Sequence, residues 1–274
     1  MSSHLDYELA GGSVIGRDHR VAYRNNQDAY YIDRFHECSL CIVTDGCSSG
    51  SRTDGSHNEL GARLGARLLA KAIHRQVFYK QSDFNVDQAL DDMLAQIRTL
   101  AAEMNDDFRH TVQENFLFTI VGALLLDECA TFFAFGDGVV IVNGKPYDMG
   151  EHDNKPNYPA YRLFEPDQLE DFGSLDLRMK IVERFPLDAL QDFLIGTDGV
   201  LDLKRAWAER LPGMESKVVG DLGQFWRDDR YFDGNPDLIS RQLRLIARDW
   251  PKNHPVPGLL PDDTTLVVGR RRMS

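Results

Sequence analysis

Four apolar stretches of this sequence meet an aspartate at one end, and this recurrence constrains the fold more than any other feature. Three of them run into the acid: CIVTDG (41–46), TFFAFGDG (131–138) and FLIGTDG (193–199). The fourth, LLPDDTTLVV, places Asp262 and Asp263 before the apolar run. Short apolar runs bounded by turn residues are typical of buried strands. The sequence therefore predicts several strands whose ends carry carboxylates.

These acids have two explanations. An aspartate-glycine pair is a common turn signal between strands, so any single copy is explained by a turn. A carboxylate at the end of a buried strand is partly desolvated, however, and this costs free energy unless a cation or a donor compensates. Several such acids at one sheet end would bind hard divalent cations through oxygen. The metal explanation gains weight as the copies accumulate.

The remaining pattern divides the chain into strands and helices. Leucines four residues apart after Glu59 predict an amphipathic helix, the same spacing predicts a second from about Val86 to Phe108, and PDLISRQLRLIARDW predicts a third. Asn143-Gly144 predicts a tight turn. Strands are expected at 12–16, 28–34, 38–44, 116–126, 131–135 and 139–143, and in RMKIVERF, DFLIGT and TTLVVGRR. This order favours an α+β fold with two packed antiparallel β-sheets flanked by helix pairs.

The chain is long enough for one large domain. Its 274 residues are 42% hydrophobic, which suffices for a sizeable core, and we expect a single domain over 1–274. Residues 146–178 are expected as an irregular loop that could act as a flap, and residues 203–232 as a helical insertion. Both segments interrupt the strand pattern.

Charge and composition exclude several classes of partner. The formal net charge of -12 disfavours nonspecific nucleic-acid binding. No apolar stretch approaches the length of a membrane helix, and the N-terminal residues lack the basic start and apolar core of a signal peptide. Four cysteines are too few for a disulfide framework in this length. We therefore expect a cytoplasmic protein that binds neither nucleic acid nor membrane.

Five short motifs in a fixed order span nearly the whole chain: NNQDAYYI, CIVTDG, FGDG, IGTDGVLD and PDDTTLVV. In this order they resemble the motifs of the type 2C metal-dependent protein phosphatases (the PPM family), and the chain is similar to a divergent, bacterial-type member. Each motif alone is weakly specific, whereas five in order are strongly so. The resemblance implies a sandwich of two antiparallel sheets with a binuclear metal centre at one edge.

The resemblance also implies roles for individual residues. Asp45 matches the acid that bridges both ions, and the carbonyl group of Gly46 matches a further ligand. Asp198 and Asp262 match the acids on one of the ions. Asp28 matches the acid that holds a metal-bound water.

Two further acids and the cofactor follow from the same resemblance. Asp137 and Asp202 match positions at which some members hold a third, weaker ion, and the expected ions are Mn²⁺ or Mg²⁺. Two divalent ions about 3.5 to 4 Å apart can clamp a phosphoryl group and lower the pKa of a water between them. The expected substrate is a phosphorylated protein, dephosphorylated at serine or threonine, and a cognate serine/threonine kinase is an expected partner.

The sequence departs from the family pattern near its first motif. Gln27 stands where many relatives carry glutamate, so one carboxylate is lost. The phosphate-binding arginine of many relatives lies five residues before the position of Asp28, where this chain has Tyr23. Arg24 is the first candidate for that role, with Arg17 and Arg20 as alternatives.

A third departure concerns the proton donor. Cys47 stands where many eukaryotic relatives have the histidine that protonates the leaving group. His19, His57 or solvent would serve instead if an acid is needed. Cys47 itself lacks the arginine six positions later that a cysteine-phosphatase cradle requires, so we expect it to be no nucleophile.

Two rival functions remain to be compared. GTDGVLD also resembles the nucleophile loop of haloacid dehalogenases, but Gly196 occupies the nucleophile position and offers no carboxylate. The stronger rival is a noncatalytic phosphatase-like module that recognises a partner. Metal binding without phosphate release would favour that rival over the enzyme.

Overall fold

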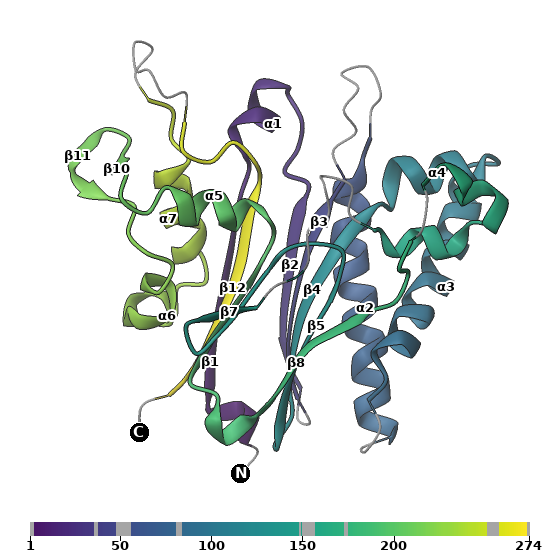
Figure 1. Cartoon of the computed structure of the whole chain (residues 1–274), viewed down its shortest axis with the longest axis horizontal. Helices are drawn as coiled ribbons and strands as arrows, with labels where there is room; N and C mark the ends of the chain where they lie inside the picture. The colour runs from purple at the N-terminus through teal and green to yellow at the C-terminus, as the bar shows by residue number, and fades with distance from the viewer. Residues whose placement is uncertain are drawn as a thin grey trace.

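The computed structural model describes residues 3–35, 38–47, 56–80, 84–147, 149, 157–172, 175–250 and 258–272. Two five-stranded sheets pack face to face, and every strand pair in them is antiparallel (Figure 1). The first sheet has the order β1 (Tyr7–Val14), β12 (Thr264–Arg271), β9 (Asp192–Gly196), β6 (Val139–Val142) and β7 (Lys145–Tyr147). The second has the order β2 (Asp28–Arg34), β3 (Ser39–Gly46), β4 (Phe118–Leu125), β5 (Cys129–Phe135) and β8 (Lys180–Pro186).

The central strands are apolar on both faces because both faces are covered. In β9, Phe193 and Ile195 pack between the two sheets, whereas Leu194 points to the helices outside. In β3, Val43 packs between the sheets and Ile42 packs toward the other helical layer. Successive side chains of a strand point to opposite faces, so each central strand contributes apolar side chains to two of the three apolar layers. This explains why the sequence shows continuous apolar runs.

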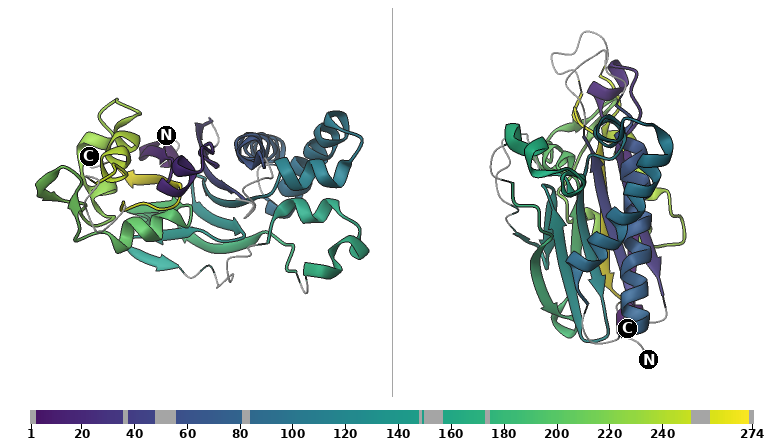
Figure 2. Two further views of the ribbon diagram at one scale, coloured as in Figure 1. Left: turned by 90° about the horizontal axis from the view of Figure 1, so that it is seen from above. Right: turned by 90° about the vertical axis from the view of Figure 1, so that its right-hand side faces the viewer.

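Three helices cover the outer face of the second sheet (Figures 1 and 2). They are α2 (Asn58–Lys80), α3 (Val86–Met104) and α4 (Phe108–Asn115). The Asn85 side chain caps α3 by accepting from the backbone N–H groups of Asp87 and Gln88. The expected second helix was too long, because it ends at Met104 and α4 begins anew after an Asp107 cap.

The outer face of the first sheet carries α5 (Gly199–Arg205), α6 (Gln224–Arg227) and α7 (Leu238–Ile246). A small hairpin of β10 (Arg210–Leu211) and β11 (Met214–Val218) follows α5. Residues 203–232 therefore contain a hairpin as well as helical turns. Helical turns also precede β1 and follow it, as η1 (Ser3–Asp6) and α1 (Arg17–Val21).

Four more 3-10 turns complete the described elements: η2 (Pro159–Leu163), η3 (Pro166–Phe172), η4 (Leu187–Ala189) and η5 (Asp229–Tyr231). The first two lie in the segment expected to be irregular, and Tyr158 and Tyr161 anchor it in the apolar layer beneath α2 and α3. Residues 148, 150–156 and 173–174 of that segment lie outside the described residues. Its role as a flap and the single-domain organisation stay predictions.

The expected α+β class with two packed antiparallel sheets and flanking helices is confirmed. The Asn143-Gly144 turn is confirmed as well, since both residues have positive φ values of 49° and 73°. The first strand was placed too late, because β1 begins at Tyr7 and pairs with β12 along its length. Among the described residues, no helix is long and apolar enough to cross a membrane.

Candidate metal centre

Asp28 and Asp45 lie opposite each other at the same end of the second sheet. β2 begins at Asp28 and the antiparallel β3 ends with Asp45 and Gly46, so pairing in register brings the two acids together. Asp28 is almost fully buried, at 4% exposure. This end lies uppermost in Figure 1, near α1.

The acids that flank the strands of the first sheet lie at the same end of the sandwich. β9 runs into Thr197 and Asp198, and its antiparallel neighbour β12 starts just after Asp262 and Asp263. The Thr197 hydroxyl donates a hydrogen bond to Asp28 Oδ2 at 2.9 Å, which joins the two sheets directly. Acids that are far apart in the sequence therefore meet because strand ends meet.

Burial and the neighbouring acids make the ionised form of each of these carboxyl groups less favourable. Burial raises the pKa of Asp45 well above its usual range, and the charges of Asp28, Asp198, Asp262 and Asp137 raise it further. Burial, with the charges of Asp262 and Asp137, raises the pKa of Asp198 to about 7, although a hydrogen bond between the Asp198 and Asp45 carboxyl groups opposes the rise. Without a cation, some of these acids would retain a proton.

Asp28 shows the same effect. Burial raises its pKa well above the usual range, the Asp263 charge adds to the rise, and the hydrogen bond from Thr197 opposes it. Desolvation by the surrounding protein also raises the pKa of Asp262, although its side chain is exposed at the rim of the site. A cation would relieve this repulsion.

Asp263 has a different environment from its neighbour Asp262. Its carboxylate accepts from the backbone N–H groups of Gly16 and Gln27, both at 2.6 Å, and lies 2.8 Å from His19 Nδ1. These contacts occupy a carboxylate that is only 2% exposed. Asp263 thus ties the start of α1 and the start of β2 to β12.

His19 is part of this arrangement. The hydrogen bond with Asp263 raises the pKa of His19 even though burial opposes the rise. One ligand atom each of His19, Asp262 and Asp263 lie within 4.8 Å of one another, a spacing that could hold a metal ion. Because Asp263 is already engaged, Asp262 is the carboxylate of this group with most freedom to bind a cation.

The two acids expected at a third ion lie at the margin of the site. Asp137 follows β5, and its charge acts on both Asp45 and Asp198. Asp202 lies one turn into α5, where its Oδ1 accepts from Arg205 Nη1 at 2.8 Å. The charge of Asp202 also reaches Asp262. The structure therefore brings both acids to the same end of the sandwich.

The candidate phosphate-binding arginines differ in their surroundings. Arg17 pairs with Asp18 at 2.7 Å, and Arg20 pairs with Asp249 at 2.9 Å. Arg24 follows α1, and its positive charge opposes the protonation of His19. Tyr23 is 98% exposed, so the side chain at the family position of the arginine points to solvent.

The Cys47 side chain is partly buried against the protein. Burial raises the pKa of its thiol, a hydrogen bond with Tyr158 opposes the rise, and Asp137 adds to it. A raised pKa disfavours the nucleophilic thiolate. His57 is 65% exposed and lies 3.6 Å from Glu59.

The donor set fits a hard divalent cation. Asp45, Asp198 and Asp262 offer carboxylate oxygens, the ligand type that Mg²⁺ and Mn²⁺ prefer. Asp198 Oδ1 is buried and has no hydrogen-bond partner among the described residues. A buried carboxylate oxygen without a donor is costly, and a cation would compensate for it.

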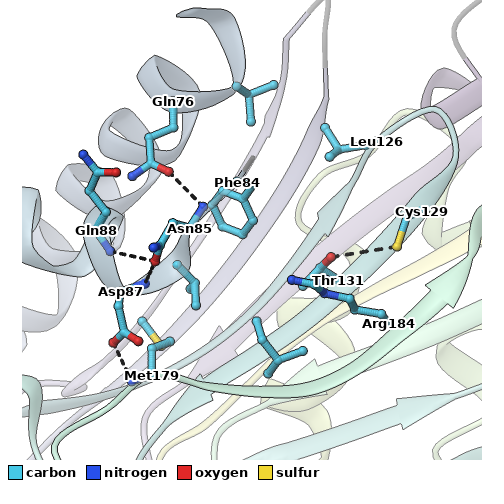
Figure 3. Close-up of a pocket in the computed structure, with 13 residues that line it drawn as sticks. Gln76, Phe84, Asn85, Asp87, Gln88, Leu126, Cys129, Thr131, Met179 and Arg184 are labelled. Carbon is cyan, nitrogen blue, oxygen red and sulfur yellow. Dashed lines mark hydrogen bonds between the residues drawn. The ribbon is translucent and has the colours of Figure 1, made fainter. Parts of the chain in front are cut away.

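A large cavity lies elsewhere in the described structure. It has a volume of about 800 Å³ and is lined by Cys129 at the start of β5, whereas Asp137 follows the other end of that strand. Figure 3 shows that its polar groups serve the fold: Gln76 accepts from the Asn85 backbone, and Asp87 accepts from the Met179 backbone. Cavity volume therefore does not locate the acidic site.

Sequence reasoning gave no role to two residues that organise the site. Asp263 looks like a duplicate of Asp262, and Thr197 looks like an ordinary strand-end residue. The usable signal was that Asp263, unlike Asp262, directly precedes the predicted strand TTLVVGRR with its apolar run Leu266 to Val268. Such an acid must be buried, and a buried acid requires donors.

Comparison with protein families identifies the class. Residues 15–221 match the family described as protein phosphatase 2C. The chain belongs to this family. Among proteins with curated descriptions, no sequence matches significantly.

Solved structures show the same fold at low sequence identity. A bacterial serine phosphatase has a TM-score of 0.53 and 15% identity, covering 97% of this chain and 98% of its own. The serine/threonine phosphatase Stp1 of Staphylococcus aureus has a TM-score of 0.51 and 14% identity, covering 97% of this chain and 95% of its own. At such identities the likeness establishes the fold alone.

Proposed function

We propose that this protein is a metal-dependent phosphoprotein phosphatase that hydrolyses phosphate monoesters of serine and threonine. The family assignment supports a protein phosphatase. The observation that carries the finer proposal is that acids from both sheets are buried beside one another, because burial, followed by the repulsion of neighbouring acids, raises the pKa values of Asp28, Asp45 and Asp198. A site built to hold divalent cations accounts for this crowding.

In this proposal Asp45 would be a ligand of both ions, and Asp198 and Asp262 would hold one of them. The Gly46 carbonyl completes the set at the end of β3, where the backbone is so close to Asn58 that a Cβ would lie 2.8 Å from its carbonyl oxygen. Bound Mn²⁺ or Mg²⁺ would supply the positive charge that activates water and neutralises phosphoryl oxygens.

The protein's own groups position the reactants. Asp28, which begins β2 of the second sheet and accepts a hydrogen bond from Thr197, would orient the attacking water. Arg24, whose positive charge acts on His19 at the same end of the sandwich, would bind the phosphoryl oxygens. His19, whose pKa is raised by Asp263, would donate a proton to the leaving oxygen.

The substrate and the remaining partners belong to the same proposal. A phosphorylated protein is the substrate, and a serine/threonine kinase acting on that protein is the opposing partner. Asp137 and Asp202 would hold a third ion, with Asp202 exchanging its pairing with Arg205 for the cation. We place the reaction in the cytoplasm.

Hydrolysis of p-nitrophenyl phosphate tests the proposal. Turnover with Mn²⁺ or Mg²⁺, its loss in excess chelator and its return on adding metal are expected. The Asp45→Asn variant is the control for contaminating phosphatases. Full activity in chelator would contradict the metal mechanism, and Mn²⁺ binding by calorimetry without phosphate release would support a noncatalytic phosphatase-like module.

A further inference from the structure

A second open site lies on the outer face of the first sheet, away from the acids. It is a groove of about 750 Å³ between the β6–β7 hairpin, α5, the residues after α5, and α6. Its apolar lining consists of Ile141, Pro146, Leu201, Trp207, Leu222 and Trp226. The mechanism proposed above uses none of these side chains.

The walls of this groove are exposed in a way that suits a protein segment. Trp207 is 59% exposed and Leu201 is 39% exposed, while Ile141 and Leu222 form a buried floor. Small-molecule sites usually enclose their ligand. Protein interfaces are instead enriched in tryptophan, which supplies much of their binding energy.

The backbone holds Trp207 in this position. Its carbonyl accepts from the Gly220 N–H at 2.9 Å, which fixes the residue after α5 against the segment before α6. On the opposite wall, the Asn143 side chain accepts from the backbone N–H groups of Gln191 and Asp192 and so fixes the β6–β7 hairpin. The groove is therefore largely formed before any partner binds.

The charge at the groove is opposite to that of the whole chain. Lys204 and Arg205 of α5 line it, although the formal net charge is -12. Asp221, which also lines the groove, is already paired with Arg227. Lys204 has no ion-pair partner among the described residues, so the groove presents a cation beside exposed aromatic rings.

We propose that this groove binds a short acidic segment of a partner protein, with apolar side chains seated against Trp207 and Trp226. An acidic group of the segment pairs with Lys204. This choice follows from charge complementarity: Arg205 is paired with Asp202 and Asp221 with Arg227, so a basic segment would face the remaining charge of Lys204. The inference concerns binding alone and holds whether or not the acidic centre is catalytic.

The probe is a synthetic peptide in which glutamate alternates with leucine and phenylalanine, compared with the same peptide carrying lysine for glutamate. The chain has three tryptophans, so NMR resolves three indole N–H signals. The acidic peptide should shift the Trp207 and Trp226 signals and leave the Trp250 signal in place. The basic peptide should shift none of them.

Two variants separate the apolar and the charged contributions. Trp207→Ala should weaken binding of the acidic peptide about tenfold or more, as loss of an interface tryptophan commonly does. Lys204→Glu should weaken it and remove the preference for the acidic peptide. Matched controls on α2, Tyr79→Ala and Lys71→Glu, change an exposed ring and an exposed lysine outside the groove and should leave affinity unchanged.

Three results would overturn the proposal. The first is equal affinity for the acidic and the basic peptide. The second is binding of the acidic peptide that is unchanged in both groove variants. The third is binding of phenylacetate at Trp207 with the same affinity as the acidic peptide. Turnover of p-nitrophenyl phosphate is measured on the same preparations. Turnover without peptide binding refutes the groove proposal alone, whereas peptide binding without turnover refutes the catalytic proposal alone.

Discussion

Asp28 and Asp45 are direct partners across the antiparallel pair of β2 and β3. Two carboxylates in this position repel each other, and burial raises the pKa of both. In the metal-free protein, ionising both acids costs free energy. A cation bound between or beside them would offset this cost. The first prediction follows from this relationship, and the second concerns Asp198 at the same site.

Asp45→Asn should cost more phosphatase activity than Gln27→Ala, because Asp45 would touch both ions and Gln27 only their waters. Removal of an interaction beyond the direct ligands typically costs about 10 to 100-fold, so Gln27→Ala should fall in that range. Initial rates with p-nitrophenyl phosphate at saturating Mn²⁺ measure both. Equal residual activity would contradict the bridging role of Asp45.

The metal-free protein should lose stability as pH rises from about 4 to about 7. The folded pKa of Asp198 is raised from 3.8 to about 7, so in this window the folded state binds more protons than the unfolded state and stability falls with pH. Thermal unfolding in excess chelator measures it. Asp198→Asn should flatten the profile and raise the neutral-pH melting temperature.

Mn²⁺ provides the control for that experiment. It should stabilise the wild type at neutral pH, because a bound cation compensates for the ionised acids. It should stabilise Asp198→Asn much less. A pH profile that is unchanged by Asp198→Asn would show that another group causes the loss.

Asp263→Ala should destabilise the fold by about 3 to 5 kcal/mol, the usual cost of removing one partner from a buried charged network. The substitution would remove the carboxylate that the backbone N–H groups of Gly16 and Gln27 and the His19 side chain contact. Chemical denaturation measures the loss. Asp18→Ala, which removes an exposed acid, should change stability by less than about 0.5 kcal/mol, and equal effects would refute the role given to Asp263.

Gly199→Ala should destabilise the protein more than Gly144→Ala. A Cβ at Gly199 would overlap the Asp263 carbonyl oxygen, so the backbone must move, at a cost of about 1 to 3 kcal/mol. A Cβ at Gly144 meets nothing within 4 Å, and only its φ of 73° resists the change, at about 1 to 2 kcal/mol. Denaturation midpoints with unchanged m-values compare the two variants.

Cys47→Ser should retain most metal-dependent turnover, and no phosphocysteine should form. The thiol is partly buried and its pKa is raised, so it is a poor nucleophile. Rate measurements and mass spectrometry of the quenched enzyme check both points. A trapped covalent phosphoenzyme would require a different mechanism.

The meeting of Asp45, Asp198 and Asp262 could be anticipated from sequence because each lies at the end of an apolar strand, whereas Asp28 was indicated only by the family resemblance. Ends of neighbouring antiparallel strands meet by geometry. The role of Asp263 could not be anticipated. It depends on backbone N–H groups of Gly16 and Gln27, whose positions are set by tertiary packing and leave no periodic signal.

The small elements escaped prediction for a related reason. α1 spans only Arg17–Val21 and is too short to show a helical period. The late start predicted for the first strand has another cause: Gly11 and Gly12 look like turn residues. In the structure Gly12 instead lies where a Cβ would collide with Ile239 of α7, so a glycine allows helix and strand to approach closely.

The position of β12 between β1 and β9 has a consequence for the order of assembly. Tyr7 pairs with Arg271, so the first sheet joins segments at opposite ends of the described chain. The second sheet contains no strand beyond β8 and can form from earlier residues alone. Such long-range pairing slows folding. We therefore expect the second sheet to be able to form while Asp262 is still missing, so that the proposed cation site is complete only when β12 inserts.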